Sequence, residues 1–258
     1  MKRTMILMAV VSMVILMAVG CFGIIRGSGD LETGYFDYSD FTSIEVGNAF
    51  EVQVVQSDSF NIAITMDDNL FDYLNISMSG ETLEIRLESS YSYFSYTNRV
   101  EITMPELRKL VFSGATSGMV NGFDCAQPLD IELSGAGSLE MSDMVAVDVD
   151  FEISGASSLN GSIMVKGGIR FNISGASSVI LSGSADDLAA DVSGASGLDL
   201  EDFPVGDVDV TFSGASNGTV NLEGTLKADL SGASHLQYIG EPIFGDLETS
   251  GASSISRK

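Results

Sequence analysis

One tripeptide returns at nearly constant intervals through the second half of the chain. Ser-Gly-Ala occurs eight times, at intervals of 21, 20, 20, 19, 20, 18 and 19 residues. A fixed period near twenty is typical of a solenoid, in which each repeat is one coil that buries its apolar face against its neighbours. The repeats begin at Ser113, Ser134, Ser154, Ser174, Ser193, Ser213, Ser231 and Ser250.

The residues that flank each tripeptide alternate between apolar and polar side chains. An example is the run from Val147 to Ile153, in which Asp148, Asp150 and Glu152 separate the apolar residues. Period two indicates strands, and no helix-period segment of useful length lies between the repeats. We therefore predict an all-β, single-chain parallel β-solenoid, a right-handed β-helix with coils of about 20 residues and at least two strands per coil.

We expect the tripeptide itself to form a structural corner. Glycine permits a left-handed backbone there, alanine is expected to fill a narrow interior, and stacked serine hydroxyls are expected to bond between coils.

The repeats divide the chain into four parts. Residues 106–258 form the regular solenoid, and residues 36–105, which alternate but lack the tripeptide, form irregular coils that cap its N-terminal end. Residues 21–35, with Gly27-Ser28-Gly29, are expected to be a flexible, lipid-anchored tether, and residues 1–20 a signal peptide. The last repeat ends close to Lys258, so we expect exposed strand edges at that end to allow self-association.

The N-terminal residues predict export. Lys2 and Arg3 precede an apolar run from Met5 to Val19, which is shorter than a comfortable membrane span. Ala18-Val19-Gly20-Cys21 resembles a lipobox, which implies lipidation of Cys21, although Ala18 stands where that motif usually has leucine. An uncleaved anchor and simple secretion are the alternatives. All three place the chain on the extracytoplasmic side, and the first two tie it to the cell-envelope membrane.

Charge narrows the choice of partners. Without residues 1–20 the chain has 10 basic and 36 acidic residues, a net charge of −26, which excludes nucleic acid as a partner. We interpret the acidic side chains as a solvated surface in preference to a calcium site, and we expect no metal and no cofactor. Cys125 is expected to be a small buried hydrophobe.

Two groups of residues suggest a site. The aromatic side chains of Tyr91, Tyr93, Phe94 and Tyr96 are candidate ligand contacts, with a packing role as the alternative. Ser216 lies in a G-x-S-x-G pattern and His235 lies one coil later, but no strand-to-helix turn is predicted there, so we expect no catalysis.

Several motifs taken in order resemble one family. They are Phe41 to Val52, Asp67 to Leu74, Gly80 to Ile85 and the Ser-Gly-Ala-Ser series. Together they resemble the auto-transporter adhesin head GIN domain family from about residue 40 to the end. The resemblance implies a β-helical fold on exported proteins, often lipoproteins, and no catalytic residues.

These observations favour a non-enzymatic binding or adhesion module of the cell envelope, with a glycan or an envelope protein as its partner. The alternatives are a polysaccharide-acting β-helix enzyme and a self-assembling structural protein. Against the enzyme, the only basic residues from 110 to 256 are Lys166, Arg170, Lys227 and His235.

Overall fold

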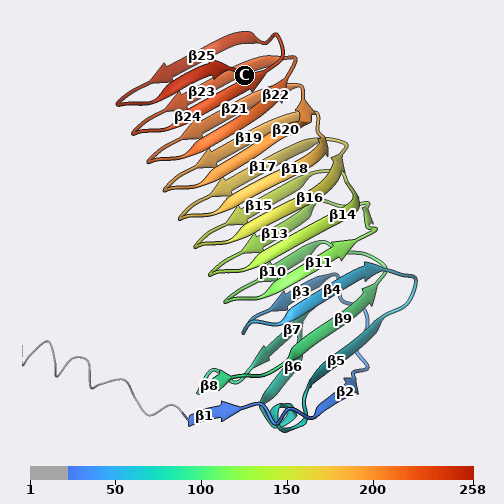
Figure 1. The fold of residues 1–258 in the computed structure, drawn as a ribbon. Helices are drawn as coiled ribbons and strands as arrows, with labels where there is room; N and C mark the ends of the chain where they lie inside the picture. Colours follow the sequence, from blue (N-terminus) through green and yellow to red (C-terminus); the bar gives the residue numbers. More distant parts are fainter. Residues whose placement is uncertain (1–22) are drawn as a thin grey trace, which may run out of the picture.

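The computed structural model describes residues 23–258, which form a column of stacked coils (Figure 1). Two long sheets make the column, one of 11 strands (sheet I) and one of 13 (sheet II). Each regular coil contributes one strand to each sheet, and neighbouring coils pair in parallel. The predicted β-solenoid with coils of about twenty residues is confirmed. Residues 1–20, predicted to be a signal peptide, and Cys21 lie outside the described residues. Within the described residues no helix is long and apolar enough to span a membrane.

Sheet I contains one strand that precedes each Ser-Gly-Ala corner, together with strands of the N-terminal region. Its members, in chain order, are β3 (Ser43–Val46), β6 (Leu74–Ser79), β7 (Thr82–Leu87), β10 (Lys109–Phe112), β13 (Leu129–Leu133), β15 (Val149–Ile153), β17 (Gly168–Ile173), β19 (Asp187–Val192), β21 (Asp207–Phe212), β23 (Thr225–Leu230) and β25 (Ile243–Thr249).

Sheet II contains one strand that follows each Ser-Gly-Ala corner, together with the short strand β12 and strands of the N-terminal region. They are β2 (Leu31–Tyr35), β4 (Glu51–Gln56), β5 (Asn61–Asp67), β9 (Asn98–Met104), β11 (Ser117–Asn121), β12 (Asp124–Cys125), β14 (Ser138–Ala146), β16 (Ser158–Val165), β18 (Ser178–Ser184), β20 (Gly197–Val205), β22 (Asn217–Leu222), β24 (His235–Ile239) and β26 (Ser254–Arg257). A separate ribbon pairs β1 (Gly23–Arg26) with β8 (Tyr91–Phe94), and one 3-10 helix, η1, covers Asp68–Tyr73.

The core is a set of apolar ladders between the two sheets. Parallel pairing in constant register places inward residues of successive coils directly above one another, as Phe151 and Phe171 show by stacking with ring centroids 4.9 Å apart. The register shifts only locally, in the pairs β14–β16, β20–β22 and β23–β25. Residue size is matched across the core. At two coils a large ring, Phe112 or Phe212, fills the space that a side chain at Gly118 or Gly218 on sheet II would occupy.

The Ser-Gly-Ala corner joins sheet I to sheet II without interrupting the hydrogen bonds between coils. All eight corner glycines have positive φ, between 72° and 86°. The corners also stack closely. The amide of Ala176 donates to the carbonyl oxygen of Gly155 at 2.7 Å, and a Cβ on Gly175 would lie 2.2 Å from that same oxygen. Glycine is therefore required both by the backbone angle and by the next coil.

The expectation for the corner alanine was wrong, because the corner alanines are exposed. It is the fourth residue of the motif that points inward, as Ser157 and Ser177 do. The Ser157 hydroxyl donates to the carbonyl of Ser154 in its own corner at 2.8 Å, and the Ser177 hydroxyl accepts the amide of Ser157 from the preceding coil at 3.4 Å. Serine hydroxyls therefore close the turns and also join coils, as the Ser193 hydroxyl does by donating to the Ile173 carbonyl at 3.4 Å. A buried hydroxyl needs such a partner, and a carbonyl three residues back is the nearest one available.

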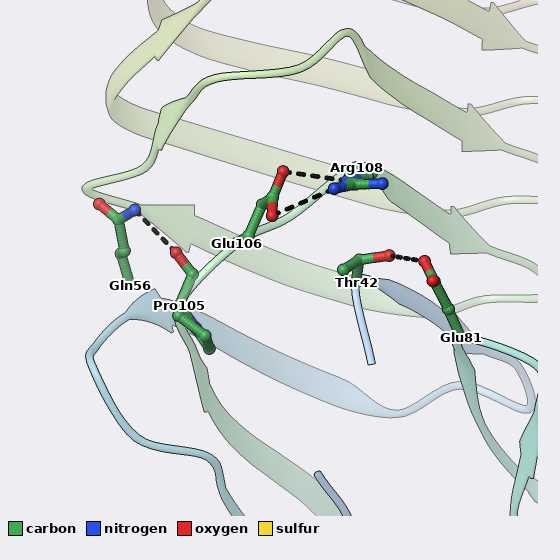
Figure 2. A network of polar contacts seen from close by, with 6 residues as sticks. All are labelled: Thr42, Gln56, Glu81, Pro105, Glu106 and Arg108. Carbon is green, nitrogen blue, oxygen red and sulfur yellow. Dashed lines mark hydrogen bonds and ion pairs between the residues drawn. The ribbon is translucent and has the colours of Figure 1, made fainter. Parts of the chain in front are cut away.

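The N-terminal region forms coils, but not in chain order. Strand β3 lies between β7 and β10, and β4 lies between β9 and β11, so the first coil of the chain is enclosed by two coils made later. Polar contacts join it to its neighbours: Thr42 donates to Glu81 at 2.9 Å, and Gln56 donates to the Pro105 carbonyl at 3.0 Å (Figure 2). Asn48, with φ 64°, stands at its corner in the place of glycine.

Antiparallel strands close the N-terminal end of the column. Strand β5 pairs antiparallel with β9, β2 with β5, and β6 with β7, and Leu70 of η1 is buried in the core. At the other end every residue of β25 is exposed. The predicted N-terminal β-rich cap is therefore present, whereas the C-terminal coil has no covering element among the described residues.

The segment expected to be a flexible tether belongs to the fold. Residues 23–35 form β1 and β2. The side chain of Asp67, which is 2% exposed, holds the turn between these strands in place by hydrogen bonds. Its carboxylate accepts the amide of Gly29 at 2.6 Å and the amide of Thr97 at 2.7 Å. A Cβ on Gly27 would lie 2.6 Å from the same carboxylate. The glycines of this segment allow close packing on Asp67 and do not indicate flexibility.

We predict that Gly175→Ala destabilises the column for two reasons. The added Cβ overlaps the Gly155 carbonyl oxygen, and an alanine at this position must adopt a positive φ. The expected loss in the free energy of unfolding is about 3 kcal/mol, measured by denaturant titration. Gly197→Ala is the control, since nothing lies within 4 Å of a Cβ there. Equal effects of the two substitutions would contradict the stacking argument.

We predict that Asp67→Ala costs about 2 to 3 kcal/mol of unfolding free energy, because it leaves two amides without an acceptor. Asp68→Ala removes only an exposed contact with Ser28 and is expected to cost under about 1 kcal/mol. Hydrogen exchange gives the location: the amides of β1 and Gly29 lose protection in the Asp67 variant. Unchanged protection there would refute the fastening role.

Candidate binding faces of the solenoid

The outer face of sheet I is strongly charged. Coil stacking aligns its outward side chains in two rows. Beyond β10 the first row has three aspartates, two basic residues and one alanine, whereas the second has five acidic residues and no basic residue. The first row is Lys109, Asp130, Asp150, Arg170, Ala189, Asp209 and Lys227, and the second is Val111, Glu132, Glu152, Asn172, Asp191, Thr211, Asp229 and Glu248. This face repels anionic polymers.

The outer face of sheet II has a different character. The row next to the corners has no charged side chain from β11 to β26: it is Ser117, Ser138, Ser158, Ser178, Gly197, Asn217, His235 and Ser254. The next row has two carboxylates in eight positions: Met119, Glu140, Asn160, Ile180, Asp199, Thr219, Gln237 and Ser256. Hydroxyl and amide groups therefore repeat along this face at the spacing between strands, about 4.8 Å.

Two shallow grooves lie on sheet II, each beside an exposed apolar side chain. The first has a volume of about 500 Å³ and surrounds Met119, which is 41% exposed. Its polar lining combines uncharged and charged side chains: Gln53, Ser117, Ser138, Asn160, Glu51, Arg99, Glu101 and Glu140. The second has a volume of about 360 Å³ and surrounds Ile180, which is 51% exposed. Its polar lining consists of Ser178, Asp199, Asn217, Thr219, His235 and Gln237. Met119 and Ile180 lie in one row, three strands or about 14 Å apart.

Sheet I has a groove of about 550 Å³ that is lined by aspartates together with Arg170 and Lys227. Part of this acidity has a structural role. Asp148 accepts the amide of Gly168 at 2.9 Å, and Asp207 accepts the amide of Thr225 at 2.6 Å, each from the following coil. Within residues 23–258 no group of three or more carboxylate, histidine or cysteine side chains has the arrangement of a metal site.

The aromatic candidates do not form one exposed patch. Tyr91 and Tyr93 lie on the face of β8 that packs on the body, where Tyr73 contacts both rings at centroid distances of 4.9 and 6.1 Å. Tyr96 contacts Tyr93 edge to face at 6.1 Å, and only Phe94, on the opposite face of β8, is exposed. Burial, followed by the Glu88 charge, raises the pKa of Tyr93 to about 12, so its phenol stays protonated at neutral pH.

The Ser216 and His235 pair is not assembled. Ser216 is fully buried and donates to the carbonyl of Ser213 at 2.8 Å, as the other inward serines do. His235 aligns with Asn217 on the outer face and contacts the Ser254 hydroxyl at 2.6 Å. The G-x-S-x-G pattern is thus a by-product of the repeated corner.

Cys125 is buried, as expected. Desolvation, followed by the neighbouring charge of Asp124, raises the pKa of its thiol to about 11. A protonated, inaccessible thiol is a poor nucleophile, so this residue belongs to the core.

Sequence reasoning missed the two grooves of sheet II. Their signal was present in the alternation, since Met119 and Ile180 are apolar residues at outward positions. Recognising that these two residues lie in one row required the register of each strand, which the structure supplies.

Comparison with known proteins agrees with this fold. The family model described as "Putative auto-transporter adhesin, head GIN domain" matches residues 40–242. No curated protein matches this chain.

Solved structures from Parabacteroides species share the fold. A "putative lipid binding protein" from Parabacteroides distasonis is 22% identical with a TM-score of 0.77, over 91% of this chain and 99% of the other. A "putative adhesin" from Parabacteroides merdae is 18% identical with a TM-score of 0.75, over 92% and 99%. A second "putative adhesin" from P. distasonis is 18% identical with a TM-score of 0.78, over 91% and 100%. Since the family model matches residues 40–242, which are most of the chain, the protein belongs to the auto-transporter adhesin head GIN domain family.

Proposed function

We propose that this protein is a non-enzymatic adhesion module of the cell envelope that binds an uncharged, hydrogen-bonding polymer, a neutral glycan, on the outer face of sheet II. The observation that carries the proposal is the difference between the two faces. The chain has a net charge of −24, yet a row of eight aligned outward positions on sheet II contains no aspartate, glutamate, lysine or arginine.

The chemistry of this face suits a glycan. Sugars present many hydroxyl groups and small apolar patches. The groove around Ile180 offers mainly amide and hydroxyl groups, and the groove around Met119 offers them together with charged side chains. A polymer laid across the strands meets equivalent groups at each coil, so that many weak contacts act together. The acidic face of sheet I disfavours anionic polymers and leaves neutral ones as the better partner.

The N-terminal sequence supports display outside the cytoplasm. Lys2, Arg3 and the apolar run to Val19 direct export, and a lipidated Cys21 or an uncleaved N-terminal segment holds the protein at the membrane. The adhesin names of two structural relatives agree with such a location. The lipid-binding name of another relative is compatible with contact with a membrane.

The groove on sheet I supports a second candidate function, the cleavage of a polysaccharide. Aspartates line this groove together with Arg170 and Lys227, and Arg170 approaches Asp150 at 3.7 Å. Most glycoside hydrolases use a pair of carboxyl groups for catalysis, and this groove contains several. The two functions therefore occupy opposite faces of the column.

We predict that the purified protein binds neutral polysaccharides and that Met119→Ser with Ile180→Ser weakens binding about tenfold, because each substitution removes apolar contact area. Met164→Ser is the matched control, since Met164 is an exposed methionine of sheet II outside both grooves. Binding is measured on an array of neutral and anionic polysaccharides, with the salt concentration varied. A neutral ligand is expected to show little salt dependence.

Three other results would overturn the assignment. Selective binding of anionic polymers would contradict the charge argument, and equal loss in the Met164 control would remove the grooves from the site. Release of new reducing ends, lost in Arg170→Ala, would favour the enzyme. Light scattering on the same samples tests the self-assembly alternative, because association through the open C-terminal coil would produce larger particles.

A further inference from the structure

The ribbon formed by β1 and β8 exposes apolar side chains on its outer face. Its parallel register aligns Ile24 with Ser92 and Arg26 with Phe94, which places these four side chains on one face. Ile24 is 75% exposed and Phe94 is 57% exposed. The Arg26 guanidinium lies over the Phe94 ring, 5.7 Å from its centroid. The ribbon therefore presents two apolar groups and one cation to its surroundings.

This face is held in a fixed position. On the inner side of the ribbon, Ile25 and Tyr93 pack against the body. Asn69 donates to the Arg26 carbonyl at 2.9 Å and accepts the amide of Ser28 at 3.0 Å, and Asp67 fastens the following turn. Exposure of Ile24 and Phe94 is thus a property of the folded protein and not of a loose terminus.

The ribbon is also the part of the fold nearest to the proposed anchor. Strand β1 begins at Gly23, two residues after Cys21. Two residues span at most about 7 Å, even when fully extended. A lipidated Cys21, or a membrane segment ending near Val19, holds the ribbon within the headgroup layer. Since residues 23–35 are built into the fold, no spacer separates the two.

We propose that the outer face of the β1–β8 ribbon, formed by Ile24, Phe94 and Arg26, rests on the lipid bilayer and sets the column upright on the membrane. Apolar and aromatic groups with a neighbouring arginine are the residue types that favour the membrane interface. The opposite end of the column, with β25, then points away from the membrane (Figure 1). This inference rests on the membrane anchoring included in the proposed function, and it adds which surface meets the lipid.

The test uses the absence of tryptophan from the sequence. The full chain, produced in a lipoprotein-processing bacterium and purified in detergent, is reconstituted into phosphatidylcholine vesicles containing brominated phosphatidylcholine. Phe94→Trp and Ile24→Trp each introduce one fluorescent probe in the ribbon. Phe244→Trp is the matched control, because Phe244 is 52% exposed on β25 at the far end.

We expect the two ribbon probes to shift to the blue and to lose emission in brominated vesicles, and the Phe244→Trp probe to do neither. Vesicle flotation reports anchoring separately. A protein that floats with vesicles while its ribbon probes stay unquenched overturns the docking and leaves the anchor intact, in which case a protein partner covers the face. Quenching of all three probes overturns the upright orientation. A protein that does not float overturns both the anchor and the docking.

Discussion

The column depends on how closely one backbone passes another at the Ser-Gly-Ala corner. The carbonyl of each corner glycine accepts the amide of the next corner alanine at 2.7 to 2.8 Å, and a Cβ on the later glycines would fall within 2.6 Å of that carbonyl. Close stacking at the corner keeps successive strands in the same register. Constant register then aligns the inward residues as ladders and the outward residues as rows. The core and the two outer faces are both consequences of this one contact.

The outward rows permit a division of roles between the faces. Outward positions are free of packing constraints, so their chemistry can differ between sheets that share one core. On sheet I acidic residues keep the protein soluble, and some, such as Asp148 and Asp207, accept amides of the next coil. On sheet II the small polar side chains of the row next to the corners project little from the sheet. A rigid scaffold with many similar positions along its length suits binding to a polymer that is itself repetitive.

The regular coils could be predicted from the sequence, whereas features that do not repeat could not. The period, the alternation and the corner glycines were sufficient for the coils from residue 106 onward. The corner alanine was predicted to point inward but is exposed, because the direction of each corner side chain depends on the turn geometry, which the pattern does not encode. The order of β3 and β4 between later strands has no local signal, since their partners are distant in the chain. Gly27 and Gly29 suggested a tether because composition does not reveal that Asp67 binds the turn. Tyr91 and Phe94 were grouped by proximity in sequence, although they lie on opposite faces of β8.

The enclosed position of β3 and β4 has a consequence for the order in which the column can fold. Strands β3 and β4 gain their second neighbours only when β10 and β11, after residue 108, are present. Until then residues 23–108 keep one side of their first coil unpaired. Once β10 and β11 are in place, each later coil needs only the one before it. Winding toward Lys258 can therefore follow only after a first closure that joins strands distant in the chain.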